Sequence, residues 1–213
     1  MSDSGFFVSV EGLDGSGKTT QVGRLAQALA ATGRQVTVVR DPGSTALGER
    51  VRDLLLEPIT GAQVSHWAET ALFLASRLQL ATEVIAPALA QGAVVVSDRY
   101  LDSTLAYQGA RGVPTGEILE MHRLCGLTRL PDLTLVLDLP VDLARVRREG
   151  ASAPDRMELE SNSYHEAVRA GYLDLAGQFP DRIVVVDADR PADELARQCE
   201  DLVRDRMNAG RQL

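Results

Sequence analysis

The chain has 213 residues, of which 45% are hydrophobic and 24% charged, and its formal net charge is −8. This length suits one domain, residues 1–213, with a sizeable buried core. The acidic balance argues against a general nucleic-acid or anionic-membrane binder, although clustered arginines could still bind small phosphorylated ligands.

We found neither an apolar run of about 18 residues nor a secretory segment, so we expect no membrane span and no export signal. The isolated cysteines, Cys125 and Cys199, have no metal-ligand spacing. They suit reduced core residues of a cytoplasmic protein.

Short apolar runs rich in β-branched residues predict five strands, at 6–10, 35–40, 93–100, 132–139 and 182–188. Helical spacing predicts helices at 21–33, 47–56, 66–92 and 191–207, and another after the loop near 109–116. Pro87 is expected to kink or break the long helix. Because strands alternate with helices, we predict an α/β fold with a doubly wound, five-stranded parallel sheet flanked by helices.

A polar stretch at 148–161 interrupts this alternation. Two interpretations stand equal on the sequence alone: a short lid inserted over a site, or a plain surface loop.

The segment 11–20 reads EGLDGSGKTT and matches the phosphate-loop pattern G-x-x-x-x-G-K-[ST] at Gly12, Gly17, Lys18 and Thr19. Lys18 is the single lysine beside 21 arginines. A compact ammonium can reach phosphates along a narrow path that a planar guanidinium would not fit, so this position needs lysine. The pattern predicts that the fold is of the P-loop NTPase type.

Backbone N–H groups of this loop and the following helix N-terminus are expected to hold the phosphates of ATP. The predicted nucleotide-binding residues are Gly12, Leu13, Asp14, Gly15, Ser16, Gly17, Lys18, Thr19 and Thr20. The Thr19 hydroxyl would bind Mg²⁺, and Asp98 at the end of a strand could lie beside the metal.

Further motifs follow the second and third strands, where ligands of open α/β sheets bind. Arg40 and Arg99 are expected to converge on the phosphate loop, unless Asp98–Arg99 is a structural ion pair. Phe73 and Arg77 share one helix face, which suits a planar base and an anionic group. Taken alone, core packing of Phe73 and a solvated Arg77 are the simpler interpretations.

Six stretches occur in order over roughly residues 6–205: EGLDGSGKTT, RDPGST, ETALFLASRLQL, SDRYLDSTLAYQGARG, LPDLTLVLDL and DRMELES. Together they resemble the thymidylate kinase family. The resemblance implies a nucleoside monophosphate kinase that transfers the γ-phosphoryl of ATP to dTMP, giving dTDP and ADP in dTTP biosynthesis. It also implies Mg²⁺ and a homodimer formed through long helices, although their apolar residues could equally be internal core.

The resemblance implies a role for each matching residue. The implied dTMP site comprises Asp14, Pro42, Arg52, Phe73, Arg77, Arg99, Thr104, Tyr107 and Gln108. Among them Phe73 would stack on thymine, and Arg52 and Arg99 would hold the acceptor phosphate. The implied catalytic residues are Lys18, Arg99 and Arg156. Because Ser16 occupies the loop position where some members carry arginine, the chain resembles the type whose catalytic arginine, here Arg156, lies in the lid.

Two positions depart from the family's Arg-Glu-Pro-Gly-Gly turn, which here has Asp41 and Ser44. Rival functions are a kinase with another acceptor, a switch GTPase or partition ATPase, and a non-catalytic binding module. The second rival needs an additional lysine that this chain lacks. A substrate panel would test the first rival, and a coupled assay for ADP release with and without dTMP would test the third.

Overall fold

The computed structural model describes residues 5–57, 64–148, 156–157 and 159–209. Its sheet has five parallel strands in the order β2-β3-β1-β4-β5, which confirms the predicted fold class. The strands are β1 (Phe6–Gly12), β2 (Val36–Arg40), β3 (Val94–Asp98), β4 (Leu133–Asp138) and β5 (Ile183–Asp187).

The three central strands are buried on both faces, as their continuous apolar runs require. In register, Val8 of β1 lies opposite Val96 of β3 and Leu133 of β4. Because all strands are parallel, β1, β2 and β3 end at one edge. The phosphate loop and the segments carrying Arg40 and Arg99 are therefore brought to that edge.

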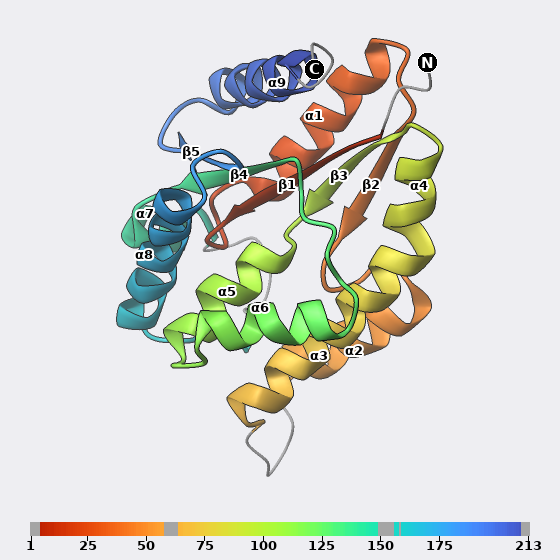
Figure 1. Ribbon diagram of the computed structural model, residues 1–213. Helices are drawn as coiled ribbons and strands as arrows, with labels where there is room; N and C mark the ends of the chain where they lie inside the picture. Colours follow the sequence, from red (N-terminus) through yellow and green to blue (C-terminus); the bar gives the residue numbers. More distant parts are fainter. Residues whose placement is uncertain (1–4, 58–63, 149–155, 158, 210–213) are drawn as a thin grey trace.

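Helices cover both faces of the sheet (Figure 1). They are α1 (Lys18–Ala31), α2 (Ala46–Leu56), α3 (His66–Leu80), α4 (Ala86–Ala90), α5 (Leu101–Ala110), α6 (Thr115–Leu124), α7 (Val141–Arg148), α8 (Asn162–Gln178) and α9 (Ala192–Ala209). Figure 1 shows α1 and α9 together over one face, with α5 and α8 below the other. The sequence had not assigned α5, α7 or α8 as helices. Cys199 is buried as expected, whereas Cys125 is exposed just after α6, so the core position expected for it is wrong.

The long helix does not break before Pro87. The chain stays helical from α3 to α4 through a five-residue π-helical segment, Ala81–Ile85. Proline has no N–H for the carbonyl four residues earlier, and its ring would clash with that carbonyl. The wider π turn, in which Ala86 N–H donates to the Ala81 carbonyl, accommodates this change.

By length and average composition alone, the run His66–Ala90 could span a membrane, with a mean hydropathy of 1.3. Two of its charged residues, Glu69 and Arg77, are buried, and each has a hydrogen-bond partner on α5. Those contacts are typical of a core helix.

The expected lid at 148–161 begins where α7 ends and stops just before α8. Most of it, residues 149–155 and 158, lies outside the described residues. Arg156 and Met157 are described. Arg156 contacts Leu55 at the end of α2, and Met157 lines a cavity together with Leu56.

Candidate active site

The phosphate loop connects the end of β1 to the start of α1. Gly17 caps the helix with a φ of 91°, and Gly15 has a φ of 88°. These left-handed conformations strain residues that carry a Cβ, and a Cβ on Gly15 would also collide with the carbonyl oxygen of Ala144. The first turn of α1 contains no acidic side chain, so its N-terminal amides are suited to phosphate oxygens.

Lys18 lies inside this loop and is only 6% exposed. Its Nζ donates to the Leu13 carbonyl oxygen at 2.8 Å and to Asp14 Oδ1 at 3.3 Å. Burial lowers the pKa of Lys18, and the nearby Arg99 charge acts in the same direction, whereas Asp14 opposes it. A phosphate oxygen entering the loop would favour the charged ammonium.

Arg99 follows β3 and reaches across the sheet edge to the loop. Its Nη2 donates to Asp14 Oδ1 at 2.6 Å, and its Nη1 donates to the Gly12 carbonyl oxygen at 3.1 Å. Burial would raise the pKa of Asp14, but Arg99 and Lys18 outweigh it and hold that pKa well below its usual range.

The backbone of Arg99 is in the left-handed region, with a φ of 68°. This conformation is costly for a residue with a Cβ, by about 1–3 kcal/mol. Its surroundings fix it: Arg99 N–H donates to the Val10 carbonyl oxygen, and the Ser97 hydroxyl donates to the Arg99 carbonyl oxygen. The strained turn aims the guanidinium back at the phosphate loop.

Three buried side chains that the sequence did not indicate, Glu11, Ser103 and Tyr172, form a cluster against the Arg99 guanidinium. Ser103 and Tyr172 hydroxyls accept from Arg99 Nη1 at 3.0 and 3.2 Å, and both hydroxyls also contact the Glu11 carboxyl. Burial, with the neighbouring Asp102 charge, raises the pKa of Glu11 to about 8. The position of Glu11, one residue before the loop motif, was the only available signal.

Thr19 and Asp98 meet at the mouth of the loop, where Thr19 Oγ1 donates to Asp98 Oδ2 at 2.8 Å. No group of three or more His, Cys, Asp or Glu side chains in the described part of the chain could hold a metal. Mg²⁺ accepts one or two protein oxygens together with substrate phosphates and water. The Thr19–Asp98 pair therefore fits this metal only when a phosphate is also present.

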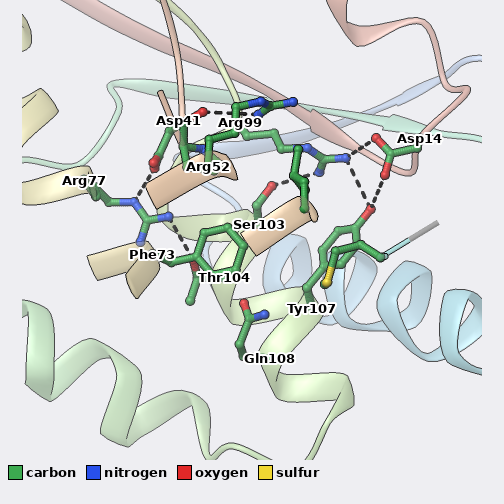
Figure 2. A pocket seen from close by; sticks show the side chains of 13 residues that line it. Asp14, Asp41, Arg52, Phe73, Arg77, Arg99, Ser103, Thr104, Tyr107 and Gln108 are labelled. Carbon is green, nitrogen blue, oxygen red and sulfur yellow. Dashed lines mark hydrogen bonds and ion pairs between the residues drawn. The ribbon is translucent and has the colours of Figure 1, made fainter. Parts of the chain in front are cut away.

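A cavity opens beside the loop, between α2, α3 and α5 (Figure 2). Its empty space, counted to the open mouth, is about 530 Å³. All nine residues predicted to bind the acceptor line it: Asp14, Pro42, Arg52, Phe73, Arg77, Arg99, Thr104, Tyr107 and Gln108. Asp41, Leu56, Ser103 and Met157 complete the lining. We call this the acceptor cavity.

Arg77 is the most constrained cation of the acceptor cavity, at 1% exposed. Its Nε donates to Asp41 Oδ2 at 2.5 Å, and its Nη2 donates to Thr104 Oγ1 at 2.8 Å (Figure 2). Its Nη1 lies 2.8 Å from His122 Nε2. It is therefore not the solvated helix charge of the simpler interpretation. Asp41 is one methylene shorter than the glutamate of the Arg-Glu-Pro-Gly-Gly turn, and its carboxylate still contacts Arg77 directly.

His122, on α6, is a second residue that sequence reasoning missed. Burial and the Arg77 charge lower the pKa of His122 to about 4. The neutral ring can accept from Arg77 through Nε2 while Nδ1–H donates to the Ile118 carbonyl oxygen at 2.7 Å. Nothing in the sequence indicates this contact, because 45 residues separate the two side chains.

A second, more open cavity lies over the phosphate loop, and we call it the donor cavity. Its lining residues are Asp14, Gly15, Gly17, Lys18, Thr19, Thr20, Arg40, Arg52, Asp98, Arg99, Arg147 and Arg148. Three of these, Asp14, Arg52 and Arg99, also line the acceptor cavity. The two cavities therefore meet at a shared rim that carries two arginines.

This chain is similar to known thymidylate kinases in sequence and in fold. Residues 10–199 match the family model for thymidylate kinase. The thymidylate kinases of Syntrophotalea carbinolica and Deinococcus radiodurans are both 46% identical to this chain. They align over 91% and 90% of it and over 92% of their own lengths. The crystal structure of Ehrlichia chaffeensis thymidylate kinase superposes with a TM-score of 0.75 at 29% identity, covering 94% of this chain and 99% of that one.

The chain belongs to the thymidylate kinase family. This confirms the resemblance drawn from the sequence, and it makes the protein a nucleoside monophosphate kinase, a phosphotransferase. Within this family, the departures at Asp41 and Ser44 can be explained locally. Ser44 has the left-handed φ of 62° that suits glycine, and its hydroxyl accepts from Arg40 N–H at 2.8 Å, which offsets part of the strain.

The structure does not bring Arg156 to the phosphate loop. Its Nε donates to the Leu55 carbonyl oxygen at 3.0 Å, and its Nη2 pairs with Glu69 on the far side of the acceptor cavity. The described arginines that do line the donor cavity and were not predicted are Arg147 and Arg148, at the end of α7. The basic sequence RVRR just before the lid was an available signal for them.

Proposed function

We propose that this protein transfers the γ-phosphoryl group of ATP to the 5′-phosphate of dTMP, giving dTDP and ADP. The observation that carries the proposal is the shared rim. A nucleotide in each cavity would have its phosphates directed at the same two arginines, Arg52 and Arg99. Phosphoryl transfer needs two polyanions held end to end with their charge neutralised, and it needs little covalent chemistry from the protein.

On the donor side, the loop amides and Lys18 would hold the β- and γ-phosphates of ATP. Lys18 now donates to Leu13 and Asp14, and phosphate oxygens would replace or join these partners. Thr19 and Asp98 would hold Mg²⁺, which when bound supplies charge neutralisation on the transferring phosphates. Arg147 and Arg148 would lie along the remaining length of the ATP molecule.

On the acceptor side, Arg52 and Arg99 would hold the dTMP phosphate. Arg52 donates to the Pro42 carbonyl oxygen at 3.2 Å, which places its guanidinium at the rim. Phe73 would stack on thymine, and Arg77, already fixed by its buried partners, would donate to a base carbonyl. The Gln108 amide oxygen is buried, has no hydrogen-bond partner among the described residues, and would accept from the base.

Tyr107 lies at the sugar-binding end, where its hydroxyl is 3.3 Å from Arg99 Nη2 and 3.4 Å from Asp14 Oδ2. A ribose 2′-hydroxyl placed here would have to share or disrupt these contacts. We therefore propose that the site prefers deoxyribonucleotides.

We propose that Arg156 is the catalytic arginine and that it reaches the donor cavity when the lid closes over both nucleotides. The move would break its contacts with Leu55 and Glu69. It would also keep water from the γ-phosphoryl group.

We further propose a single-domain, cytoplasmic homodimer without nucleic-acid or membrane partners. The buried apolar residues form one continuous core around the sheet, and the net charge is −8. Exposed apolar side chains on α2 and α3, Leu47, Leu54 and Trp67, support a dimer contact through these helices.

The test is a panel of nucleoside monophosphates, each mixed with the protein, ATP and Mg²⁺, with the diphosphate product identified by chromatography. We expect dTDP from dTMP, with other monophosphates much slower. ADP release at the same rate with and without dTMP, or a faster reaction with a purine monophosphate, would refute the proposal.

A further inference from the structure

Glu69 is a buried carboxylate in the first turn of α3, at 1% exposed, and its two oxygens have different partners. Oε1 accepts from Gln108 Nε2 at 2.9 Å and lies 3.4 Å from Arg111 Nε. Oε2 pairs with Arg156. The carboxylate is thus held by a guanidinium at each oxygen, and only Oε1 contacts the amide of Gln108.

An amide side chain has a donor end and an acceptor end, and a carboxylate can only accept. The NH₂ group of Gln108 must therefore face Glu69, which leaves its carbonyl oxygen facing the acceptor cavity. Gln108 is completely buried and lines this cavity. In Figure 2 its oxygen points up, toward Phe73 and Thr104.

We propose that Glu69 is a positioning residue that fixes the Gln108 amide and so selects the base. This inference rests on the proposed function of the cavity. With the amide held this way, the base edge must carry a hydrogen-bond donor. Thymine and uracil offer N3–H, whereas cytosine has a lone pair at N3 that would face the Gln108 oxygen and leave both acceptors unpaired.

Because the two oxygens of Glu69 have different partners, its contact with Gln108 does not depend on Arg156. Arg156 uses Oε2, so its departure toward the donor cavity would leave the Oε1 contact with Gln108 in place. Arg111 would remain beside Oε1, and it is anchored further by Glu160 at 2.8 Å and by Tyr164 at 3.2 Å. Glu69 would therefore keep a positive neighbour whether or not Arg156 moves away.

The experiment compares kcat/KM for dTMP and dCMP in wild type and in Glu69→Gln. A glutamine at this position can present either end of its amide, so the Gln108 amide is free to turn its NH₂ group into the cavity. We expect the ratio of kcat/KM for dTMP to that for dCMP to fall about tenfold, the change that corresponds to one hydrogen bond.

Glu160→Gln is the matched control, because it removes a carboxylate from Arg111 without touching Gln108; its dTMP/dCMP ratio should equal that of wild type. Gln108→Ala should lower the ratio similarly, and adding Glu69→Gln to Gln108→Ala should change it no further. If Glu69→Gln does not fold, Glu69→Asp decides the question: it keeps the charge but withdraws the carboxylate from Gln108, and the dTMP/dCMP ratio should again fall.

The proposal is overturned if Glu69→Gln slows both substrates equally and keeps the wild-type ratio, or if Gln108→Ala keeps that ratio. Failure of the proposed function looks different: wild type would then phosphorylate neither dTMP nor dCMP, and both proposals would fall.

Discussion

The acceptor cavity and the donor cavity share a rim but differ in how their charged side chains are held. In the acceptor cavity, Arg77 is buried and bonded to Asp41, Thr104 and His122. At the donor cavity, the Thr19–Asp98 and Arg40–Glu49 pairs are exposed. The wall that would contact a base is thus built in advance. At the donor cavity Lys18 is buried, but the Thr19–Asp98 and Arg40–Glu49 pairs around it are open to solvent and can rearrange.

This contrast predicts that substitutions at the donor cavity change the rate of transfer, and that substitutions behind the acceptor cavity change stability and substrate choice. Four experiments test this contrast.

The largest effect is expected at Lys18. Lys18→Ala should reduce transfer by at least about 10³-fold, because the loop loses the cation buried beside the transferring phosphates. Lys18→Arg should fail almost as completely, since the wider guanidinium does not fit the path to the Leu13 carbonyl. The measurement is ADP release in a coupled assay, with circular dichroism to verify folding. Near-wild-type activity of Lys18→Arg would contradict the shape argument.

Arg156→Ala is expected to lower kcat by about 10³-fold or more while leaving KM for dTMP within a few-fold of wild type. The reason is that Arg156 contacts Leu55 and Glu69 in this structure, and would reach the phosphates only during transfer. Steady-state kinetics with dTMP as the varied substrate measure both constants. A wild-type kcat would remove Arg156 from catalysis.

Asp41→Ala should destabilise the protein by about 3–5 kcal/mol, because it leaves the buried Arg77 without its carboxylate partner. Glu49→Ala is the matched control from the same segment, since it breaks the exposed pair with Arg40. It should cost less than about 1 kcal/mol. Urea unfolding measures the change in the free energy of unfolding for both variants. Equal losses in the free energy of unfolding would mean that the charged side chains of the two cavities are held equally firmly.

The smallest effect concerns pH. The folded-state pKa of His122, about 4, is below its unfolded value of 6.5. The unfolded chain therefore binds more protons between these values, and the free energy of unfolding should fall as pH drops from 6.5 to 4, by up to about 3 kcal/mol from this residue. His122→Gln should weaken that dependence. Identical pH profiles for wild type and His122→Gln would refute the assignment.

Much of this arrangement could be predicted from the sequence. The strands are apolar runs buried on both faces, and the phosphate loop is a local motif between a strand and a helix. Once parallel strands are predicted, their shared edge brings Arg40, Arg99 and Lys18 together. The family resemblance supplied the remaining acceptor residues, which the structure gathers around one cavity.

Other parts could not be predicted for identifiable reasons. Helix α5 is almost wholly buried and includes polar residues such as Ser103 and Gln108, so it shows no clear amphipathic period. The contacts of Glu69 with Gln108 and of Arg77 with His122 join residues 39 and 45 positions apart. No local pattern encodes them, because they depend on how the helices pack.

The most direct test of the shared rim is a crystal structure with dTMP and a non-hydrolysable ATP analogue bound together. We expect thymine against Phe73 and Gln108, the dTMP phosphate between Arg52 and Arg99, and the analogue's γ-phosphate beside Lys18. A dTMP phosphate bound away from both arginines, or the two nucleotides bound with their phosphates apart, would contradict the account.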